Sequence, residues 1–111
     1  MMIITKAIEA AFAKQGDTSN KSMDEIKIVM KLFNPIGAGT WYIYEKLNED
    51  HYMAFVNLGD PVCAEMGTVS MQELMSLRLP LGMKIERDMH FEPLKHTLKT
   101  VYDVIKGNGH V

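Results

Sequence analysis

The sequence predicts an α+β fold, in which a mostly antiparallel sheet of about five strands is combined with three helices in the order αββββαβα. Apolar residues recur at helical spacing near both ends of the chain, and short segments with a two-residue period fill the middle. The composition, with 47% hydrophobic and 23% charged residues in 111, is that of an ordinary globular domain. We therefore expect one domain over residues 1–111, with an N-terminal helix and linker (1–22), a sheet core (23–93), and a C-terminal helix and tail (94–111).

The N-terminal segment has the pattern of an amphipathic helix that packs on the core. Its apolar positions follow helical spacing and are interrupted by Lys6 and Glu9, and the pattern ends near Gly16. The apolar positions are Ile3, Ile4, Ala7, Ile8, Ala11 and Phe12. A polar linker, residues 16–22, follows.

The next segments read as four strands joined by short turns, which is typical of an antiparallel meander. Asn48, Glu49 and Asp50 form a polar turn between the second and third strands, so these two should pair as a hairpin. In the first strand, alternation places Ile26, Ile28, Met30 and Leu32 on one face. The four strands cover Ile26–Phe33, Thr40–Leu47, His51–Leu58 and Val62–Val69.

Ser70 and Glu73 have the spacing of a capping box and predict a short helix that continues to about Leu77. The run LGMKIERDMHFEP, residues 81–93, supplies a fifth strand, and Pro93 should begin the last helix. That helix has an apolar stripe and ends at Gly107. We expect the helices to pack on one face of the sheet. The stripe consists of Leu94, Leu98, Val101, Tyr102 and Ile105.

Arg87 is the anomaly of the fifth strand, because alternation places it on the otherwise apolar face. A buried guanidinium needs a charged partner, since an isolated charge in a core is unstable. Glu65, in the middle of the fourth strand, is the partner that we predict, and Glu86 or Asp88 could replace it if a bulge shifts the register. At a cleft, Arg87 would instead be suited to a carboxylate or phosphate of a ligand.

The remaining chemistry-bearing residues have ordinary structural explanations. Asp88, His90 and Glu92 occupy alternate positions, so a strand would present all three on one face, where they could bind a metal ion. A solvent-exposed strand face explains these polar residues better. We therefore expect no metal and no cofactor. Trp41 lies in a strand whose aromatic residues are typical of a core. The strand lacks the basic residues that a stacking platform for single-stranded nucleic acid would have between them. Cys63 lies in an apolar run and is expected to be a small buried side chain.

Charge and hydropathy exclude several classes of partner. Twelve basic against fourteen acidic residues give a net charge of −2, so a basic surface for duplex nucleic acid is not expected. There is no apolar run long enough to cross a bilayer, and the N-terminal segment lacks the cationic start of a signal peptide. We expect a cytoplasmic protein that does not bind a membrane, and the sequence carries no strong signal for nucleic-acid binding.

Four motifs, KLFNP, TWYIYE, AEMGTVSMQEL and LPLGMKIERDMHFEP, resemble in order and spacing a bacterial family named only as a domain of unknown function, DUF2958. The resemblance covers about Met30 to Pro93, with mild departures at Met66, Thr68 and Met71. It implies no reaction and no catalytic residue, because the family has none established. Members of this family are often encoded on plasmids, phages and integrative elements, and the resemblance therefore implies an accessory role. The motif positions matched here are Trp41, Glu45, Glu65, Gly67, Glu86, Arg87 and Asp88.

Two hypotheses follow. The first is a non-enzymatic accessory protein that acts through a protein partner and presents Glu86, Asp88 and His90 as its recognition surface. The second is a small enzyme or a binder of an anionic ligand, with a site around Glu65, Glu86 and Arg87. A concave pocket that holds these side chains would favour the second, and a flat face with Arg87 in an ion pair would favour the first.

Overall fold

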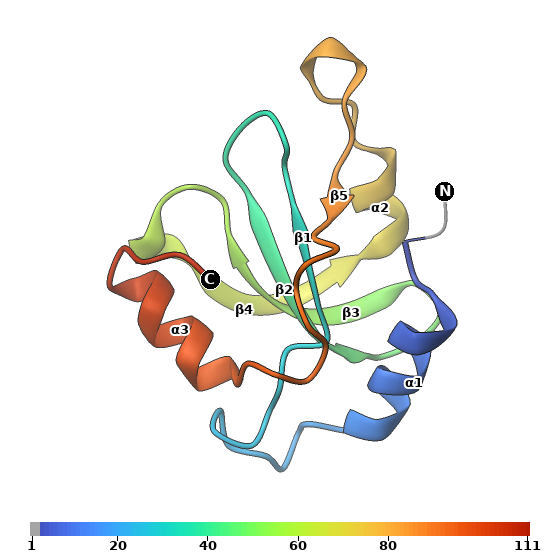
Figure 1. The fold of residues 1–111 in the computed structure, drawn as a ribbon, viewed down its shortest axis with the longest axis vertical. Helices are drawn as coiled ribbons and strands as arrows, with labels where there is room; N and C mark the ends of the chain where they lie inside the picture. The colour runs from blue at the N-terminus through green and yellow to red at the C-terminus, as the bar shows by residue number, and fades with distance from the viewer. Residues whose placement is uncertain (1–2) are drawn as a thin grey trace.

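The protein, in a computed structural model that describes residues 3–111, contains one five-stranded antiparallel sheet with helices on both of its faces (Figure 1). The order across the sheet is β4-β3-β2-β1-β5. The predicted α+β class and element order are confirmed; the first two residues of the predicted domain lie outside the described range. The strands are β1 (Met30–Phe33), β2 (Thr40–Lys46), β3 (His51–Asn57), β4 (Glu65–Ser70) and β5 (Glu86–Arg87). The helices are α1 (Lys6–Gln15), α2 (Met71–Ser76) and α3 (Leu98–Lys106).

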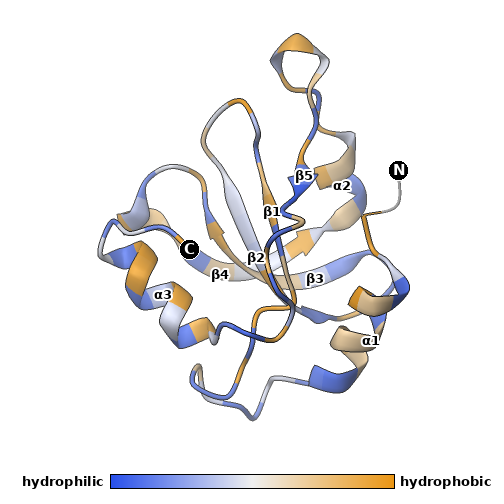
Figure 2. Cartoon of the chain, in the orientation of Figure 1, coloured by the Kyte–Doolittle hydropathy of each residue, from blue (hydrophilic) through white to orange (hydrophobic). Residues whose placement is uncertain are grey.

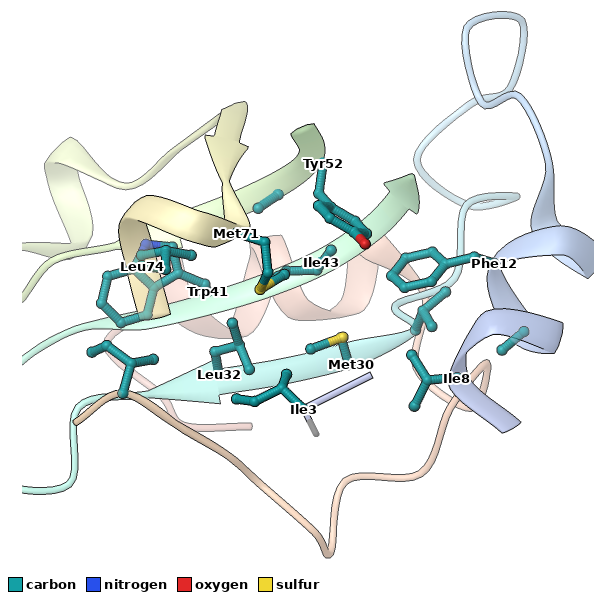
Figure 3. Packing of buried hydrophobic residues seen from close by; sticks show 14 residues of the cluster. Ile3, Ile8, Phe12, Met30, Leu32, Trp41, Ile43, Tyr52, Met71 and Leu74 are labelled. Carbon is teal, nitrogen blue, oxygen red and sulfur yellow. The ribbon is translucent and has the colours of Figure 1, made fainter. Parts of the chain in front are cut away.

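Two apolar cores, one on each face of the sheet, hold the fold together. Trp41 and Ile43 of β2 pack with α1 and α2, as Figure 3 shows for the first core. Tyr42 and Tyr44, which alternate with them, pack with α3 in the second core. The prediction that the helices cover one face was therefore wrong. The central strands are apolar on both faces, and such strands need cover on both sides.

The first strand was predicted to begin at Ile26, but β1 begins at Met30, and a β-bulge just ahead of it interrupts the predicted alternation. Val29 N donates to Ile43 O at 2.8 Å although Met30 lies directly opposite Ile43, so two residues of one strand face one of the other. Ile28 therefore belongs to the core under α3, and Met30 belongs to the core under α1. Ahead of the bulge, the backbone pairs with residues 94–98 instead of with β2.

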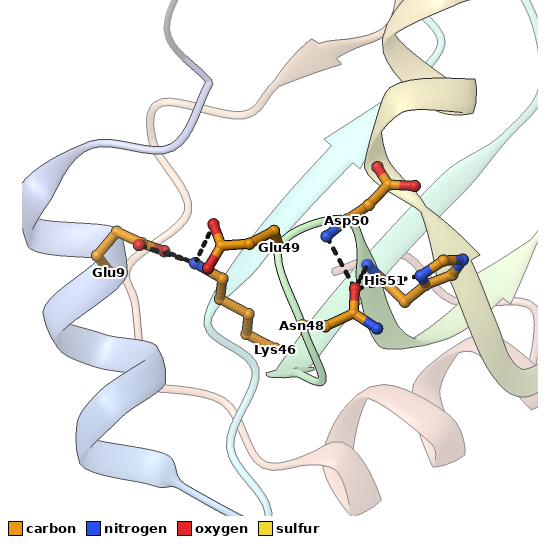
Figure 4. A network of polar contacts seen from close by, with 6 residues as sticks. All are labelled: Glu9, Lys46, Asn48, Glu49, Asp50 and His51. Atoms are coloured by element: carbon orange, nitrogen blue, oxygen red, sulfur yellow. Dashed lines mark hydrogen bonds and ion pairs between the residues drawn. The ribbon is translucent and has the colours of Figure 1, made fainter.

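The predicted hairpin between β2 and β3 is confirmed. The carboxamide oxygen of Asn48 accepts hydrogen bonds from the amides of Asp50 (2.9 Å) and His51 (2.8 Å), which closes the turn (Figure 4). Lys46 at the end of β2 pairs with Glu9 of α1, with 2.9 Å between Nζ and Oε2. The turn thus also attaches the first helix to the sheet.

A second bulge, at Tyr44 in β2, is filled by a side chain from α1. Gln15, at the last turn of the helix, donates from Nε2 to the carbonyl oxygens of Lys27 and Tyr44, the latter at 2.7 Å. Its Oε1 accepts from Lys27 N at 3.0 Å. One buried amide therefore satisfies three backbone groups that the sheet leaves unpaired.

The ends of the helices follow the sequence signals with one exception. Ser70 Oγ accepts from Glu73 N at 3.2 Å, as the capping box predicts, and α1 and α3 end at Gly16 and Gly107. The last helix begins at Leu98 and not at Pro93. Thr97 caps its first turn by accepting from Thr100 N.

The predicted long fifth strand is reduced to the two residues of β5, because the chain turns immediately afterwards. The Asp88 carboxylate accepts from His90 N at 2.9 Å, and Phe91 N donates to Asp88 O at 3.2 Å. These local bonds compete with strand pairing and end it. None of the helices among residues 3–111 is long and apolar enough to cross a lipid bilayer.

Candidate functional site

A cleft of about 630 Å³ lies beside β5. Its walls come from β1 and β2 with the loop between them, the end of β3, β5 with the turn after it, and α3 with the segment that follows it. β5 itself is strongly hydrophilic (Figure 2). The volume falls within the range of about 300–1,000 Å³ that is typical of ligand sites. The lining side chains that carry charge at neutral pH are Lys31, Glu86, Arg87 and Asp88, with His90 and His110 beside them.

Lys31 is the buried cation of this cleft, with its side chain only 6% exposed. Its Nζ donates to the backbone oxygen of Val111 at 2.6 Å and lies 3.8 Å from Asp88 Oδ2. The hydroxyl of Tyr42 donates to the same Val111 oxygen at 3.2 Å. Burial lowers the pKa of Lys31, and the charge of Asp88 partly opposes that effect.

The register of β1 with β5 explains why these groups converge. Glu86 lies opposite Phe33, and Asp88 N donates to Lys31 O at 2.9 Å, so both carboxylates are on the α3 side of the sheet. Lys31 was not among the residues predicted to belong to a site. The available signal was its position between apolar residues of a strand that is buried on both faces.

Arg87 lies opposite Leu32 and therefore leans toward the other side of β5. It is half-buried at the edge of the cleft. Among residues 3–111 neither Arg87 nor Glu86 takes part in an ion pair. Two opposite charges, neighbours in sequence, are thus left available beside the cleft, one on each face of β5.

The predicted ion pair between Arg87 and Glu65 was wrong. Glu65 is on β4 and Arg87 on β5, at the two opposite edges of the sheet. Four strand spacings of about 4.8 Å put them about 19 Å apart. Half-exposure of Arg87 removes the need for a buried partner, because water solvates the guanidinium.

The structure brings four of the seven candidate residues together: Glu86, Arg87, Asp88 and His90 line the cleft. The other three do not. Trp41 is buried in the core beneath α2, whereas Glu65 is exposed on β4. Glu45 accepts hydrogen bonds from the amide and hydroxyl of Thr18 and so holds the linker after α1.

Cys63 is exposed, which corrects the prediction of a small buried side chain. It lies in a short 3₁₀ turn, Pro61–Cys63, that carries it to the surface ahead of β4. The thiol donates a hydrogen bond to Asp60 Oδ2 at 3.5 Å, and this bond, together with the negative charge of that carboxylate, raises the pKa of Cys63. In the part of the chain described here, no group of three His, Cys, Asp or Glu side chains is placed to hold a metal ion.

A family model described as "Protein of unknown function (DUF2958)" matches residues 3–111. The chain belongs to this family. The match extends beyond the four motifs to both terminal helices of this DUF2958 member, so the cleft beside β5, including the segment after α3, lies within the family region. No curated protein and no solved structure matches the chain.

Proposed function

We propose that this DUF2958 protein is a non-enzymatic binding protein that acts through a protein partner, which it recognises at the cleft beside β5. The observation that supports this most is that Glu86 and Arg87 both line that cleft and, among residues 3–111, take part in no ion pair. Their side chains leave β5 on opposite faces, so a partner that wraps this edge with a base on the α3 side and an acid on the other side would complete both ion pairs. The arrangement fixes register and orientation more than it adds affinity.

The expected role as an accessory of a plasmid, phage or integrative element belongs to the same proposal. It draws on the family resemblance and not on the geometry of the cleft. The cleft meets the concave-pocket criterion of the ligand hypothesis only in part, because it holds Glu86 and Arg87 but not Glu65. It is open to solvent and lined by both polar and apolar side chains, and such a surface suits a polypeptide segment.

A second candidate function, binding of a small anion, is favoured by Lys31 and Tyr42. The ammonium and the hydroxyl converge on one oxygen atom, that of Val111. A carboxylate or phosphate oxygen that displaced Val111 would meet the same two donors there. The site first expected for such a ligand included Glu65, which the strand order places on the far edge of the sheet.

The experiment is an affinity capture from nuclease-treated lysate of the native host, followed by binding measurements with the purified partner. The test variant is Glu86→Gln/Arg87→Gln, which keeps the net charge. The matched control is Glu73→Gln/Arg78→Gln, which neutralises an exposed acid and an exposed base outside the cleft.

We expect a partner that binds the wild type and the control alike and binds the cleft variant about tenfold or more weaker. Equal binding by the two variants would contradict the proposal. If no partner is captured, titration of the wild type and Lys31→Met with acetate and with inorganic phosphate, followed by NMR, tests the second candidate. Shifts around Lys31 and Tyr42 that are absent in Lys31→Met would support it.

A further inference from the structure

β4 is the long free edge of the sheet. At the opposite edge, β5 contributes two residues only, whereas β4 contributes six residues that pair with β3 without a register shift. Natural sheets protect such edges with lysine, proline, a bulge or a covering element. The sequence of β4, EMGTVS, contains neither lysine nor proline.

The hydrogen-bond phase shows which backbone groups this edge presents. Met71 N donates to Asp50 O at 2.8 Å, which makes this the first hydrogen-bonded pair of the β3–β4 ladder. Bonded pairs alternate along an antiparallel ladder, so Met66 and Thr68 occupy non-bonded positions opposite Phe55 and Met53. Their N–H and C=O groups therefore point away from β3.

Gly67, between them, is not explained by the fold of a single copy. Its φ is not positive, and a Cβ built on it meets no atom within 4 Å. Glycine weakens a strand interior and often marks the close approach of another backbone. A Cβ at position 67 would project from the face of the sheet, so it is the outward backbone groups of Met66 and Thr68 that mark the open edge as the side for an approaching strand.

Exposed apolar side chains gather at the same edge. Two of them, Leu58 and Met66, line a second, smaller cleft of about 330 Å³ beside the strand. Water-exposed apolar groups beside unpaired backbone groups are typical of a surface that another polypeptide covers. The side chains are those of Leu58 (68% exposed), Val62 (83%) and Met66 (41%).

We infer that β4 pairs antiparallel with β4 of a second copy of this chain, to form a ten-stranded sheet across a twofold axis. With Met66 opposite Thr68 of the second copy, all outward groups of these two residues are bonded. Gly67 then faces Gly67 of the second copy in a non-bonded pair, where the Cα atoms come within about 4.5 Å. Glu65 meets Val69 of the second copy, so no like charges are opposed.

A second copy fits this edge because β4 is self-complementary about Gly67: the register that bonds the outward groups of Met66 and Thr68 also places Glu65 opposite an apolar residue. Each copy also brings the same exposed apolar residues to the interface. An isologous contact of this kind is the commonest route to a closed dimer.

The test is the mass in solution by light scattering and sedimentation over a range of concentrations, for the wild type, Thr68→Pro and Thr68→Val. Proline removes the outward N–H and spares the β3 ladder; valine keeps the N–H and is the matched control. We expect the wild type and Thr68→Val to reach twice the monomer mass and Thr68→Pro to associate at least about tenfold more weakly. Glu86→Gln/Arg87→Gln should dimerise like the wild type, which separates this test from that of the cleft.

A wild-type monomer at about 1 mM overturns the inference, and so does dimerisation of Thr68→Pro that equals that of the wild type. If Thr68→Pro does not fold, amide hydrogen exchange of the wild type decides. Protection of the Met66 and Thr68 amides that rises with concentration supports the pairing. Fast exchange of both amides in the dimer places the interface elsewhere and refutes it.

Discussion

Replacement of Gln15 by leucine should destabilise the protein by removing the amide that fills the bulge in β2. Three hydrogen bonds to backbone groups are lost, each worth about 1 kcal/mol net. Leucine has a similar size and returns about 1 kcal/mol through apolar burial. The free energy of unfolding should therefore fall by about 2 kcal/mol, which lowers the urea midpoint by about 1 M for an m-value near 2 kcal/mol/M.

The control is Lys14→Leu, at the exposed neighbouring position, which should change the free energy of unfolding by less than about 0.5 kcal/mol. Gln15→Glu should be as destabilised as Gln15→Leu at neutral pH, because both donors are gone and a carboxylate faces two carbonyl oxygens. Acidification should recover part of that loss, since a protonated carboxyl again donates once. A Gln15→Leu midpoint equal to that of Lys14→Leu would refute the reasoning.

Three further predictions concern titrating groups. Hydrogen bonds from Ser70 and from the Gln72 amide lower the pKa of Asp50. In urea unfolding, the wild type should therefore be more stable than Asp50→Asn at neutral pH. This difference should disappear as the pH falls through the lowered pKa. Burial lowers the pKa of Lys31, so the unfolded chain binds more protons at alkaline pH. The stability of the wild type relative to Lys31→Met should then increase from about pH 8 to about pH 10; a decrease would contradict the burial effect. Asp60→Asn should accelerate alkylation of the Cys63 thiol at fixed pH, because the carboxylate that raises the thiol pKa is removed; an unchanged rate would speak against this cause.

Local signals in the sequence predicted most of the fold. The turn at Asn48, the cap at Ser70 and the helix end at Gly16 each depend on contacts within a few residues, and the structure contains all three. The β-bulge at Val29 was not predictable, because alternation alone does not show where an extra residue enters a strand. Helices on both faces follow from the tertiary pairing of strands and not from any one segment.

The candidate site was predictable only in its local part. Glu86 and Asp88 share a side of the chain by simple alternation, and the structure places both in the cleft. The partner chosen for Arg87 was wrong because strand order decides which residues meet, and order across a sheet is not encoded in the spacing of one strand. Lys31 enters the site because its carbonyl oxygen accepts a hydrogen bond from the amide of Asp88, far away in the sequence.

The two-residue ladder between β1 and β5 has a consequence for how the molecule folds. β2, β3 and β4 are joined by short connections and form contacts between near neighbours, whereas Leu32 and Arg87 pair across about 55 positions of chain. Closure of such a long loop carries a larger entropy loss, so the meander should form early and β5 should dock late. In the native state the same strand should be among the first to detach. A ligand bound in the cleft would contact β5 and would therefore slow the detachment of this strand from the native sheet.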